Sequence, residues 1–521
     1  MHPGRHSQAD LHLVPSMSPT DMNTCESMPN KFRDKTEKSD GLDDLQMERA
    51  VPDFQHKQLT GSTEENRLVR KLDMRIIPTL SIIYLFAFLD RSNLGNARLQ
   101  GFPQDVLGGD PTGNLFDWTN TAFYIAYIIF QVPATIVSKL CPPRIWLGCA
   151  AIGWATASTL LSTSFNIAGA MTCRVFLGIF EAGFAPGMPL YFSLWYTRDE
   201  IGFRLAQWTC SSAVAGAFGG LIAFGIQEAR VSIANWRLLF IVEGIPTVLL
   251  GLLVMRLLPN RPEETSFLDE AERKLQLERM NRGMRADFGR TLTKRHILDG
   301  FLDWRVYAGG VVYMGSNCAL SALSAFLPTI LRTFGFSNAQ AQLMTVPPYM
   351  VCAVVMCTCS YVSDKIQSRG LFIVCTTATC GVGYALLLTV ADNNHVRYFA
   401  TFLITTGTYT TNGLMIAWYA HNLGSETKKA TGTPIYMAIG QCGSILGTHL
   451  FPVTEGPRYI KGFAVSCSIL FLASIVALVL TVSYRLENAR RDRRYGKIED
   501  RHATVDVRGL ADKTPEFRYV P

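Results

Sequence analysis

The sequence has little charge for its length. Asp, Glu, Lys and Arg make up 17% of its 521 residues, whereas average soluble proteins carry about 25%. Almost all of the apolar residues lie between two polar stretches, residues 1–70 and 486–521. A soluble protein of several domains would instead alternate surface and core residues along its whole length. The composition therefore excludes a disordered, collagen-like or small disulfide-rich class for the long region between the polar stretches.

The sequence also lacks the motifs of most enzymes and cofactor-binding proteins. Its loops contain no nucleophile–base arrangement, phosphate-binding loop or metal-ligand spacing, so we expect no enzyme activity, no cofactor and no metal site. The 13 cysteines are scattered, mostly within apolar stretches, where they are expected to serve as small packing residues. The amino-terminal stretch has no basic region followed by an apolar run, so we expect no cleavable signal peptide.

What the sequence does contain is a series of long apolar stretches. A bilayer core of about 30 Å needs about 20 mostly apolar residues in a helix. Twelve stretches come near that length, at residues 74–94, 119–140, 145–164, 168–193, 204–226, 237–258, 306–330, 341–362, 370–390, 397–420, 432–453 and 462–484. The sequence therefore predicts an all-α membrane protein with 12 transmembrane helices in two six-helix halves.

Lys and Arg are distributed unevenly between the two sets of predicted loops. The loops on one side carry only Arg98, Arg230, Arg332, Arg458 and Lys461. The central loop 259–305 alone carries 10 such residues, and five more arginines begin the carboxyl-terminal tail. Since cytoplasmic loops hold Lys and Arg in excess, we predict that the central loop and both termini are cytoplasmic. The net charge of +7 is mostly of this topological origin, and no basic face indicates a nucleic-acid partner.

The central loop divides the chain. We predict a disordered cytoplasmic tail at 1–70, an amino-terminal six-helix half at 71–258, a cytoplasmic central loop at 259–305, a carboxyl-terminal six-helix half at 306–484 and a cytoplasmic tail at 485–521. The first tail is rich in Ser, Thr, Asp, Glu and Lys, which is typical of disorder. Repeated halves around a midplane site are the architecture of secondary transporters.

Four charged residues inside the predicted spans carry the functional argument. Charges are costly in a membrane, so they indicate substrate or proton pathways. Asp90 and Arg91 end the first span, and Arg174 and Glu181 lie in the fourth. Seven residues are close to two helical turns, so Arg174 and Glu181 share one helix face, about 10 Å apart.

Two interpretations of these charges are open. A guanidinium grips a substrate carboxylate with two parallel hydrogen bonds, and a buried carboxyl group takes up and releases a coupling proton. The first interpretation is therefore an anion site coupled to protons. The second is a set of purely structural ion pairs that close one side of the bundle.

Uncharged polar residues in the spans are further candidates for substrate contact. Tyr127 and Gln131 are four residues apart and share a face of the second span. Asn412 and Gln441 lie in the tenth and eleventh spans. We expect Tyr127, Asn412 and Gln441 to bind substrate through hydrogen bonds.

Two more ionisable residues lie in the spans. Glu243 is six residues from Arg237, so we expect it to bond a neighbouring helix or loop as a structural group. His449 lies in the eleventh span. It is either a hydrogen-bonded packing residue or a protonatable ligand.

The chain resembles the anion:cation symporter family of the major facilitator superfamily, most narrowly its fungal branch of allantoate and nicotinate permeases. The similarity covers about residues 70–485. The matching motifs are Asp90-Arg91, Lys139…Pro142-Pro143-Arg144, Arg174-Val175-Phe176-Leu177-Gly178…Glu181-Ala182-Gly183, Trp236-Arg237…Glu243-Gly244-Ile245-Pro246, Thr345-Val346-Pro347-Pro348-Tyr349 and Gly456-Pro457-Arg458-Tyr459.

The resemblance implies a role for each charged residue. Arg91 would contact the substrate carboxylate, Asp90 and Glu181 would be the protonation sites, and Arg174 would couple them. Gln441 stands where family members have a substrate-contacting Asn, and the stretch around it departs from the usual Gly-Asn…Gly-Pro pattern.

The resemblance also implies a function. The chain would be a proton-coupled symporter of the plasma membrane that works by alternating access. Its partners would be protons, the lipid bilayer and a small organic anion, such as a carboxylate vitamin, nitrogen source or organic acid, and we expect a monomer. Two alternatives are a proton-linked exporter of a secondary metabolite and a non-transporting nutrient sensor.

Overall fold

The computed structural model describes the chain from residue 40 onward, apart from residues 230, 286–292, 457, 498–504 and 508. The chain divides into two units, Met1–Glu65 and Asn66–Pro521. In the first unit, the described residues form the start of helix α1 (Asp40–Leu99). The first 39 residues of the tail predicted to be disordered lie outside the described residues, and α1 begins at Asp40.

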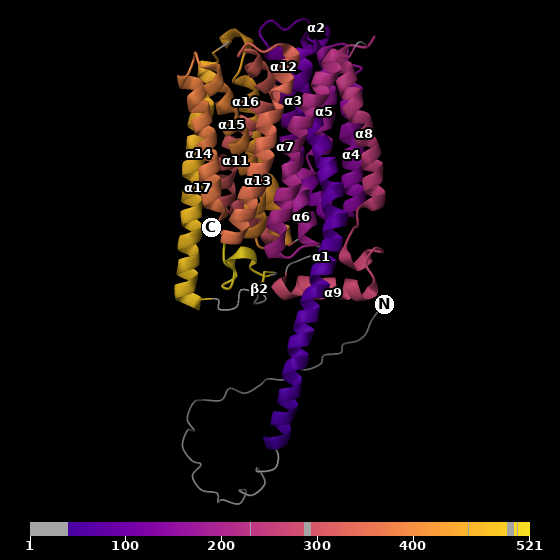
Figure 1. Ribbon diagram of the computed structural model, residues 1–521, viewed down its shortest axis with the longest axis vertical. Helices are drawn as coiled ribbons and strands as arrows, with labels where there is room; N and C mark the ends of the chain where they lie inside the picture. Colours follow the sequence, from indigo (N-terminus) through magenta and orange to yellow (C-terminus); the bar gives the residue numbers. More distant parts are fainter. Residues whose placement is uncertain (1–39, 230, 286–292, 457, 498–504, 508) are drawn as a thin grey trace, which may run out of the picture. The chain divides into compact units, whose positions relative to one another are not determined.

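The second unit is a bundle of long helices (Figure 1). Its first group runs on from α1 through α2 (Phe102–Val106), α3 (Asn114–Leu140), α4 (Pro143–Leu161), α5 (Ile167–Glu181), η1 (Ala185–Gly187), α6 (Met188–Ser193), α7 (Arg198–Glu228) and α8 (Asn235–Leu257). A connecting region follows, with η2 (Pro262–Glu264), α9 (Glu270–Gly283), β1 (Met284–Arg285) and α10 (Lys294–Leu302).

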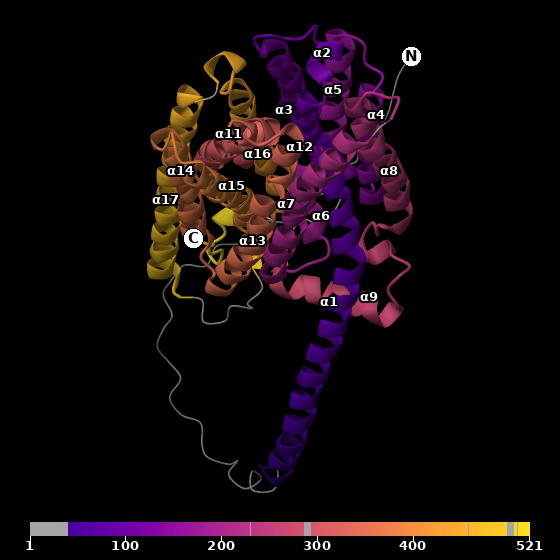
Figure 2. The same ribbon diagram turned by 45° about the horizontal axis from the view of Figure 1, so that its top comes forward.

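The second group completes the bundle. It comprises α11 (Trp304–Arg332), α12 (Asn338–Leu343), α13 (Val346–Ile366), α14 (Arg369–Thr389), α15 (Asn394–Asn422), α16 (Glu426–His449), η3 (Val453–Glu455), α17 (Ile460–Tyr495), β2 (Val505–Asp506) and η4 (Ala511–Lys513). We call the group α1–α8 the first half and the group α11–α17 the second half. Figures 1 and 2 show the two halves side by side, the first in indigo to magenta and the second in orange to yellow.

Each of the twelve predicted spans corresponds to one helix or to one broken pair of helices. The predicted span 168–193 breaks between α5 and α6, where Pro186 and Pro189 lack the amide that an α-helical hydrogen bond needs. The predicted span 341–362 breaks in the same way between α12 and α13, next to Pro347 and Pro348.

Nine helices in the described part of the chain are long and apolar enough to cross a membrane. The other three predicted spans are α4, α15 and α16. Helices α15 and α16 are rich in Thr and are buried along most of their length, so they face protein rather than lipid. Polar residues are tolerated in a membrane helix where neighbouring helices cover them. The weak hydropathy of α15 and α16 therefore reflects their interior position.

The halves meet along two seams. Helix α3 packs against α16, and α7 packs against both α13 and α15. Within the first half, Gly178 of α5 lets that helix approach α3 closely, because a Cβ there would lie 2.4 Å from the carbonyl oxygen of Phe123. This close approach carries Arg174 and Glu181 to the inner side of the first half.

The connecting region and the end of the chain lie at the same end of the bundle, at the bottom of Figure 1. We call it the basic end, since the predicted loops there carry most of the Lys and Arg, and the opposite end the far end. Strand β1 pairs in parallel with β2, with Met284 opposite Val505. Residues 509–521 continue from there into contacts with several helices, which are described below.

Candidate functional site

A cavity of about 530 Å³ lies between the two halves. We call it the central cavity. Its first-half lining consists of Tyr84, Phe88, Arg91, Tyr127, Ala185, Thr209 and Ser212. Its second-half lining consists of Tyr313, Asn317, Leu320, Tyr409, Asn412, Gly413, Ile416, Met437 and Gln441. Among these residues Arg91 is the one that carries a full charge.

Arg91 of α1 is held by a carboxylate and by aromatic rings. Its Nη2 forms an ion pair with Oε1 of Glu181 on α5. The guanidinium carbon lies 5.2 Å from the ring centre of Phe123 and 5.4 Å from that of Tyr127. Such cation–π contacts stabilise a desolvated guanidinium. Arg91 is therefore a fixed cation at the wall of the central cavity.

Asp90 faces away from the central cavity, although it is the neighbour of Arg91. Its Oδ1 accepts a hydrogen bond of 2.6 Å from Oγ of Ser158 on α4, and its side chain is fully buried. Its Oδ2 has no hydrogen-bond partner among the described residues. Successive residues on a helix point about 100° apart. Asp90 therefore lies behind Arg91, at the interface of α1 and α4.

Arg174 also lies outside the cavity lining. Its Nη2 donates a hydrogen bond of 3.4 Å to Oδ1 of Asn120 on α3, and its Nε and Nη1 have no partner among the described residues. Arg174 and Glu181 share a face of α5, as their spacing predicted, but the ion pair of Glu181 is with Arg91. The three predicted proton-coupling residues therefore lie outside the cavity lining, and each has a different partner, Ser158 for Asp90, Asn120 for Arg174 and Arg91 for Glu181.

The predicted uncharged contacts all reach the central cavity. Tyr127, Asn412 and Gln441 line it. Both amide atoms of Asn412 are buried without a partner among the described residues, whereas Oε1 of Gln441 accepts a hydrogen bond of 2.9 Å from Ser444. Gln131 is not among the lining residues, although it shares a helix face with Tyr127.

The sequence did not predict several of the lining residues, above all Tyr84, Phe88, Tyr313, Asn317 and Tyr409. Tyr84 stands seven residues before Arg91, the spacing that places two residues on one helix face, so that signal was available. Asn317 is an amide inside an apolar stretch, which is a weaker signal of the same kind as Asn412. The aromatic residues gave no signal, because aromatic side chains are common throughout membrane helices.

Contacts between the halves close the central cavity toward the far end. Oγ1 of Thr121 on α3 lies 3.0 Å from Nε2 of His449 on α16 and 3.3 Å from Oγ1 of Thr448. The rings of Phe116 and Phe326 meet 6.4 Å apart. His449 is therefore a hydrogen-bonded residue of this closure, and it does not line the cavity.

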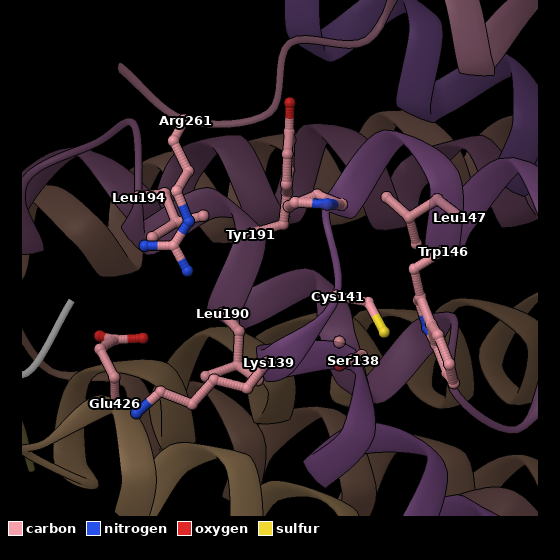
Figure 3. Close-up of a pocket in the computed structure, with 12 residues that line it drawn as sticks. Ser138, Lys139, Cys141, Trp146, Leu147, Leu190, Tyr191, Leu194, Arg261 and Glu426 are labelled. Carbon is pink, nitrogen blue, oxygen red and sulfur yellow. The ribbon is translucent and has the colours of Figure 1, made fainter. Parts of the chain in front are cut away.

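The basic end is closed as well. Nζ of Lys139 on α3 donates a hydrogen bond of 2.8 Å to Oγ1 of Thr427 on α16, and Oγ of Ser193 on α6 donates one of 2.7 Å to Oε2 of Glu426. A second pocket of about 520 Å³ adjoins these contacts. In Figure 3 the side chains of Lys139 and Arg261 extend toward Glu426 within this pocket. The structure is therefore occluded, with the central cavity closed at both ends.

Glu243 and Arg237 of α8 do not pair with each other. Nη1 of Arg237 donates a hydrogen bond of 2.6 Å to the carbonyl oxygen of Ser162, and its Nη2 donates one of 3.1 Å to that of Ser164. The Glu243 side chain is buried, and neither of its oxygens has a hydrogen-bond partner among the described residues. Arg237 thus ties α8 to the end of α4.

The chain matches a known protein family, and its sequence is similar to those of several transporters. The family described as Major Facilitator Superfamily matches residues 80–448. The major facilitator-type transporter hxnP of Emericella nidulans is 32% identical over 87% of this chain and 93% of its own length. The high-affinity nicotinic acid transporter of Saccharomyces cerevisiae is 28% identical over 88% of this chain and 85% of its own length.

Solved structures show the same fold at low identity. The partially occluded, inward-open xylose transporter XylE of E. coli superposes with a TM-score of 0.61 at 12% identity, over 79% of this chain and 97% of XylE. The proton:xylose symporter XylE bound to 6-bromo-6-deoxy-D-glucose gives a TM-score of 0.61 at 13% identity, over 85% and 99% of the two chains.

Proposed function

This chain belongs to the major facilitator superfamily, and from that premise we propose that it is a proton-coupled symporter for a small organic anion. It is a multi-pass membrane transporter. This agrees with the predicted all-α fold with two six-helix halves. Its relatives are named as transporters, so the expectation that it is not an enzyme is confirmed. The family assignment leaves the cargo and the driving ion to be argued from the site.

The ion pair between Arg91 and Glu181 carries the proposal. It places one cation at the wall of the central cavity and satisfies that cation with a carboxylate that can be protonated. A substrate carboxylate that enters the cavity competes with Glu181 for the same guanidinium. Arg binds carboxylates through two parallel hydrogen bonds, so it is well suited to either partner.

Charge balance in the closed cavity links substrate to proton. With no cargo, Arg91 and Glu181 cancel each other. A bound anion with ionised Glu181 leaves one excess negative charge, and protonated Glu181 without an anion leaves Arg91 unpaired. An uncompensated buried charge is costly. The closed state is therefore favoured when both an anion and a proton are bound, or when neither is bound. A carrier that closes only in these two cases moves the anion and the proton together, which is symport.

The neighbouring residues extend this scheme. Asp90 is a second buried carboxyl group that Ser158 holds behind Arg91, and we assign it a share in proton transfer. Arg174 keeps the layer that contains Glu181 electrostatically positive, which favours return of the proton. Tyr127, Asn412 and Gln441 hydrogen-bond the rest of the substrate from the cavity wall.

The orientation is part of the proposal. We place the basic end and both termini in the cytoplasm and the far end outside a plasma membrane, because Lys and Arg accumulate in cytoplasmic loops. The nicotinic acid transporter of Saccharomyces cerevisiae, whose cargo is a carboxylate, supports a compact carboxylate as the substrate class.

The experiment begins with the purified protein and a library of small carboxylates. A ligand raises the melting temperature in proportion to the logarithm of its concentration above Kd. Each stabilising compound is then tested for uptake into proteoliposomes with and without an imposed proton gradient. We expect uptake against the substrate gradient only when the proton gradient is present.

Two Glu→Gln variants complete the experiment, one as the test of coupling and the other as its matched control. Glu181→Gln removes the coupling carboxylate, and we expect its uptake to ignore the proton gradient. Glu228→Gln removes an exposed carboxylate at the end of α7, and we expect it to behave as the unaltered protein does. Gradient-independent uptake by the unaltered protein, or a Glu181→Gln variant that remains fully coupled, would contradict the proposal.

A further inference from the structure

The last residues of the chain, 509–521, lie against the basic end of the bundle. Phe517 is fully buried, and Tyr519 is 4% exposed. The Tyr519 ring stacks on Tyr484 of α17 at 4.9 Å. Nη1 of Arg491 donates hydrogen bonds to the carbonyl oxygens of Asp512, Thr514 and Phe517. A segment with buried aromatic side chains and paired carbonyl groups is a docked element of the fold, and we call it the strap.

The strap is anchored to the second half at several points. Asn488 of α17 makes two hydrogen bonds to the backbone of Tyr519, of 2.7 and 2.9 Å. Asn422 at the end of α15 pairs with the backbone of Val520 in the same way, at 2.8 and 3.0 Å. Nζ of Lys428 on α16 forms an ion pair with Asp512 at 2.6 Å. Burial raises the pKa of the Tyr519 hydroxyl, which therefore stays protonated and donates to Asp512 at 2.9 Å.

The strap touches the first half through Arg198, the first residue of α7. Nη2 of Arg198 donates a hydrogen bond of 2.7 Å to the carbonyl oxygen of Arg518. The guanidinium carbon of Arg198 also lies 4.4 Å from the ring centre of Phe517. The strap therefore bridges the two halves on the side where Lys139 and Glu426 close the basic end.

We propose that residues 509–521 form a strap that holds the basic end closed, and that its contact with Arg198 breaks each time that end opens. Opening the basic end requires the first residues of α7 to move away from α15 and α17. The many anchors on the second half keep the strap there, so the contact with Arg198 is the one that yields. A hydrogen bond from a charged donor together with a cation–π contact biases the equilibrium toward the closed form.

The test measures the separation of the two halves at the basic end. Spin-labelled noncanonical residues replace Arg144, near the start of α4 in the first half, and Gln367, directly after α13 in the second half. Both positions are exposed, and this labelling does not react with the native cysteines. Double electron–electron resonance on the purified protein then gives the populations of short and long distances. We expect deletion of 509–521 and the single change Arg198→Ala each to raise the long-distance population about tenfold.

Two further variants test whether the effect of Arg198→Ala comes from its contact with the strap. Arg198→Lys retains a charged donor, so we expect a smaller increase than with Arg198→Ala. Lys513→Ala removes a surface ion pair between the strap and Asp299 of α10 and leaves the bridge to α7 intact, so we expect the unaltered distribution. Distances that stay unchanged in both the deletion and Arg198→Ala would overturn the proposal. The measurement needs no substrate, so it is independent of the proposed cargo.

A separate observation concerns two cysteines on facing helices of the two halves. Sγ of Cys210 on α7 lies 3.3 Å from Sγ of Cys357 on α13. Neighbouring contacts show how closely these helices approach, since a Cβ at Gly216 would lie 2.6 Å from the ring of Tyr349. Both thiols are half-buried. The pair therefore needs only a small movement to reach bonding distance.

We infer that Cys210 and Cys357 are an oxidisable pair that joins the halves covalently. Hydrogen peroxide, a small uncharged oxidant, converts one thiol to a sulfenic acid and leaves as water. The second thiol then attacks the sulfenic sulfur, forms the disulfide and releases a second water. The two electrons pass from the thiols to the peroxide, and a dithiol reductant reverses the reaction.

A cleavable version of the full chain tests this pair. A protease site inserted beside the exposed Ser266 separates the fragment with Cys210 from the fragment with Cys357 on denaturing, non-reducing gels. After peroxide treatment we expect the fragments to stay joined, and to separate with reductant or in Cys210→Ser and Cys357→Ser. Separation of the oxidised unaltered protein, or joined fragments in either variant, would overturn the inference.

Discussion

The two halves give the central cavity different chemistry. The first half supplies Arg91, which pairs with Glu181 on the same half. The second half supplies the uncharged amides of Asn317, Asn412 and Gln441. Both partners of the ion pair belong to one half, so under the proposed function a rocking motion between the halves leaves the pair intact, and a competing anion or a proton opens it.

The amides of the second half act in another way. No charged partner reaches Asn412, and both of its amide atoms are without a partner among the described residues. A substrate held by Arg91 can reach these amides only across the cavity, so it links the halves. Under the proposed function, proton coupling is assigned to the first half, and the amide contacts with the rest of the substrate are assigned to the second half.

The largest expected effect comes from Arg91→Ala. The change removes the anion contact and leaves Glu181 buried without its cation, which costs about 3–5 kcal/mol in comparable buried pairs. We expect initial uptake to fall at least about 100-fold and the melting temperature to fall as well. The exposed Arg144→Ala is the matched control. Substantial uptake by Arg91→Ala would show that the first half does not supply the anion site.

The next effect is a change in coupling. Glu181→Gln keeps the size of the side chain and removes the ionisable carboxyl group, so Arg91 loses its resident partner. We expect substrate to bind at least as tightly, while accumulation driven by a proton gradient falls about tenfold or more. Binding by calorimetry and uptake at several external pH values separate the two quantities. Loss of binding with coupling intact would reverse the assigned roles.

A moderate effect is expected in the second half. Asn412→Ala deletes an amide that faces the cavity, and one hydrogen bond contributes about 1 kcal/mol. We expect KM to rise about fivefold with the pH dependence of uptake unchanged. A variant that shifts the pH profile instead would place part of the coupling in the second half.

The smallest effect is expected for Gln441→Ala. Its Oε1 already accepts a hydrogen bond from Ser444, so less of its bonding capacity is open to substrate than at Asn412. We expect KM to rise about two- to threefold, with a changed ranking among carboxylates that differ away from the carboxylate group. Competition assays against one labelled substrate measure that ranking. An effect larger than that of Asn412→Ala would make Gln441 the principal contact.

The fold could be predicted largely from hydropathy, except where the ends of a helix differ from the ends of the apolar run that faces lipid. The span predicted at 74–94 lies near the carboxyl-terminal end of α1, which runs from Asp40 to Leu99, because a helix continues beyond the membrane as long as its backbone hydrogen bonds do. The span predicted at 168–193 is broken between α5 and α6. Both differences arise because an apolar run reports contact with lipid and not the hydrogen bonding of the backbone.

The candidate site was only partly visible in the sequence. The cost of burying charge singled out Asp90, Arg91, Arg174 and Glu181, and the helical period placed the last two on one face. The period could not say which partner Glu181 takes, because Arg91 reaches it from another helix. The docking of residues 509–521 was not foreseen, since its polar composition resembles that of an exposed tail.

The order of the residues is enough to establish that this chain spans a membrane, which of its residues are costly there and which loops are basic. Those properties follow from composition and from the local geometry of a helix. The packing of the helices, in contrast, is needed to explain why Arg91 faces the central cavity while its neighbour Asp90 bonds Ser158. The rotation of α1 about its own axis makes that choice, and it is set by packing against α4 and α5, helices that lie far away in the sequence.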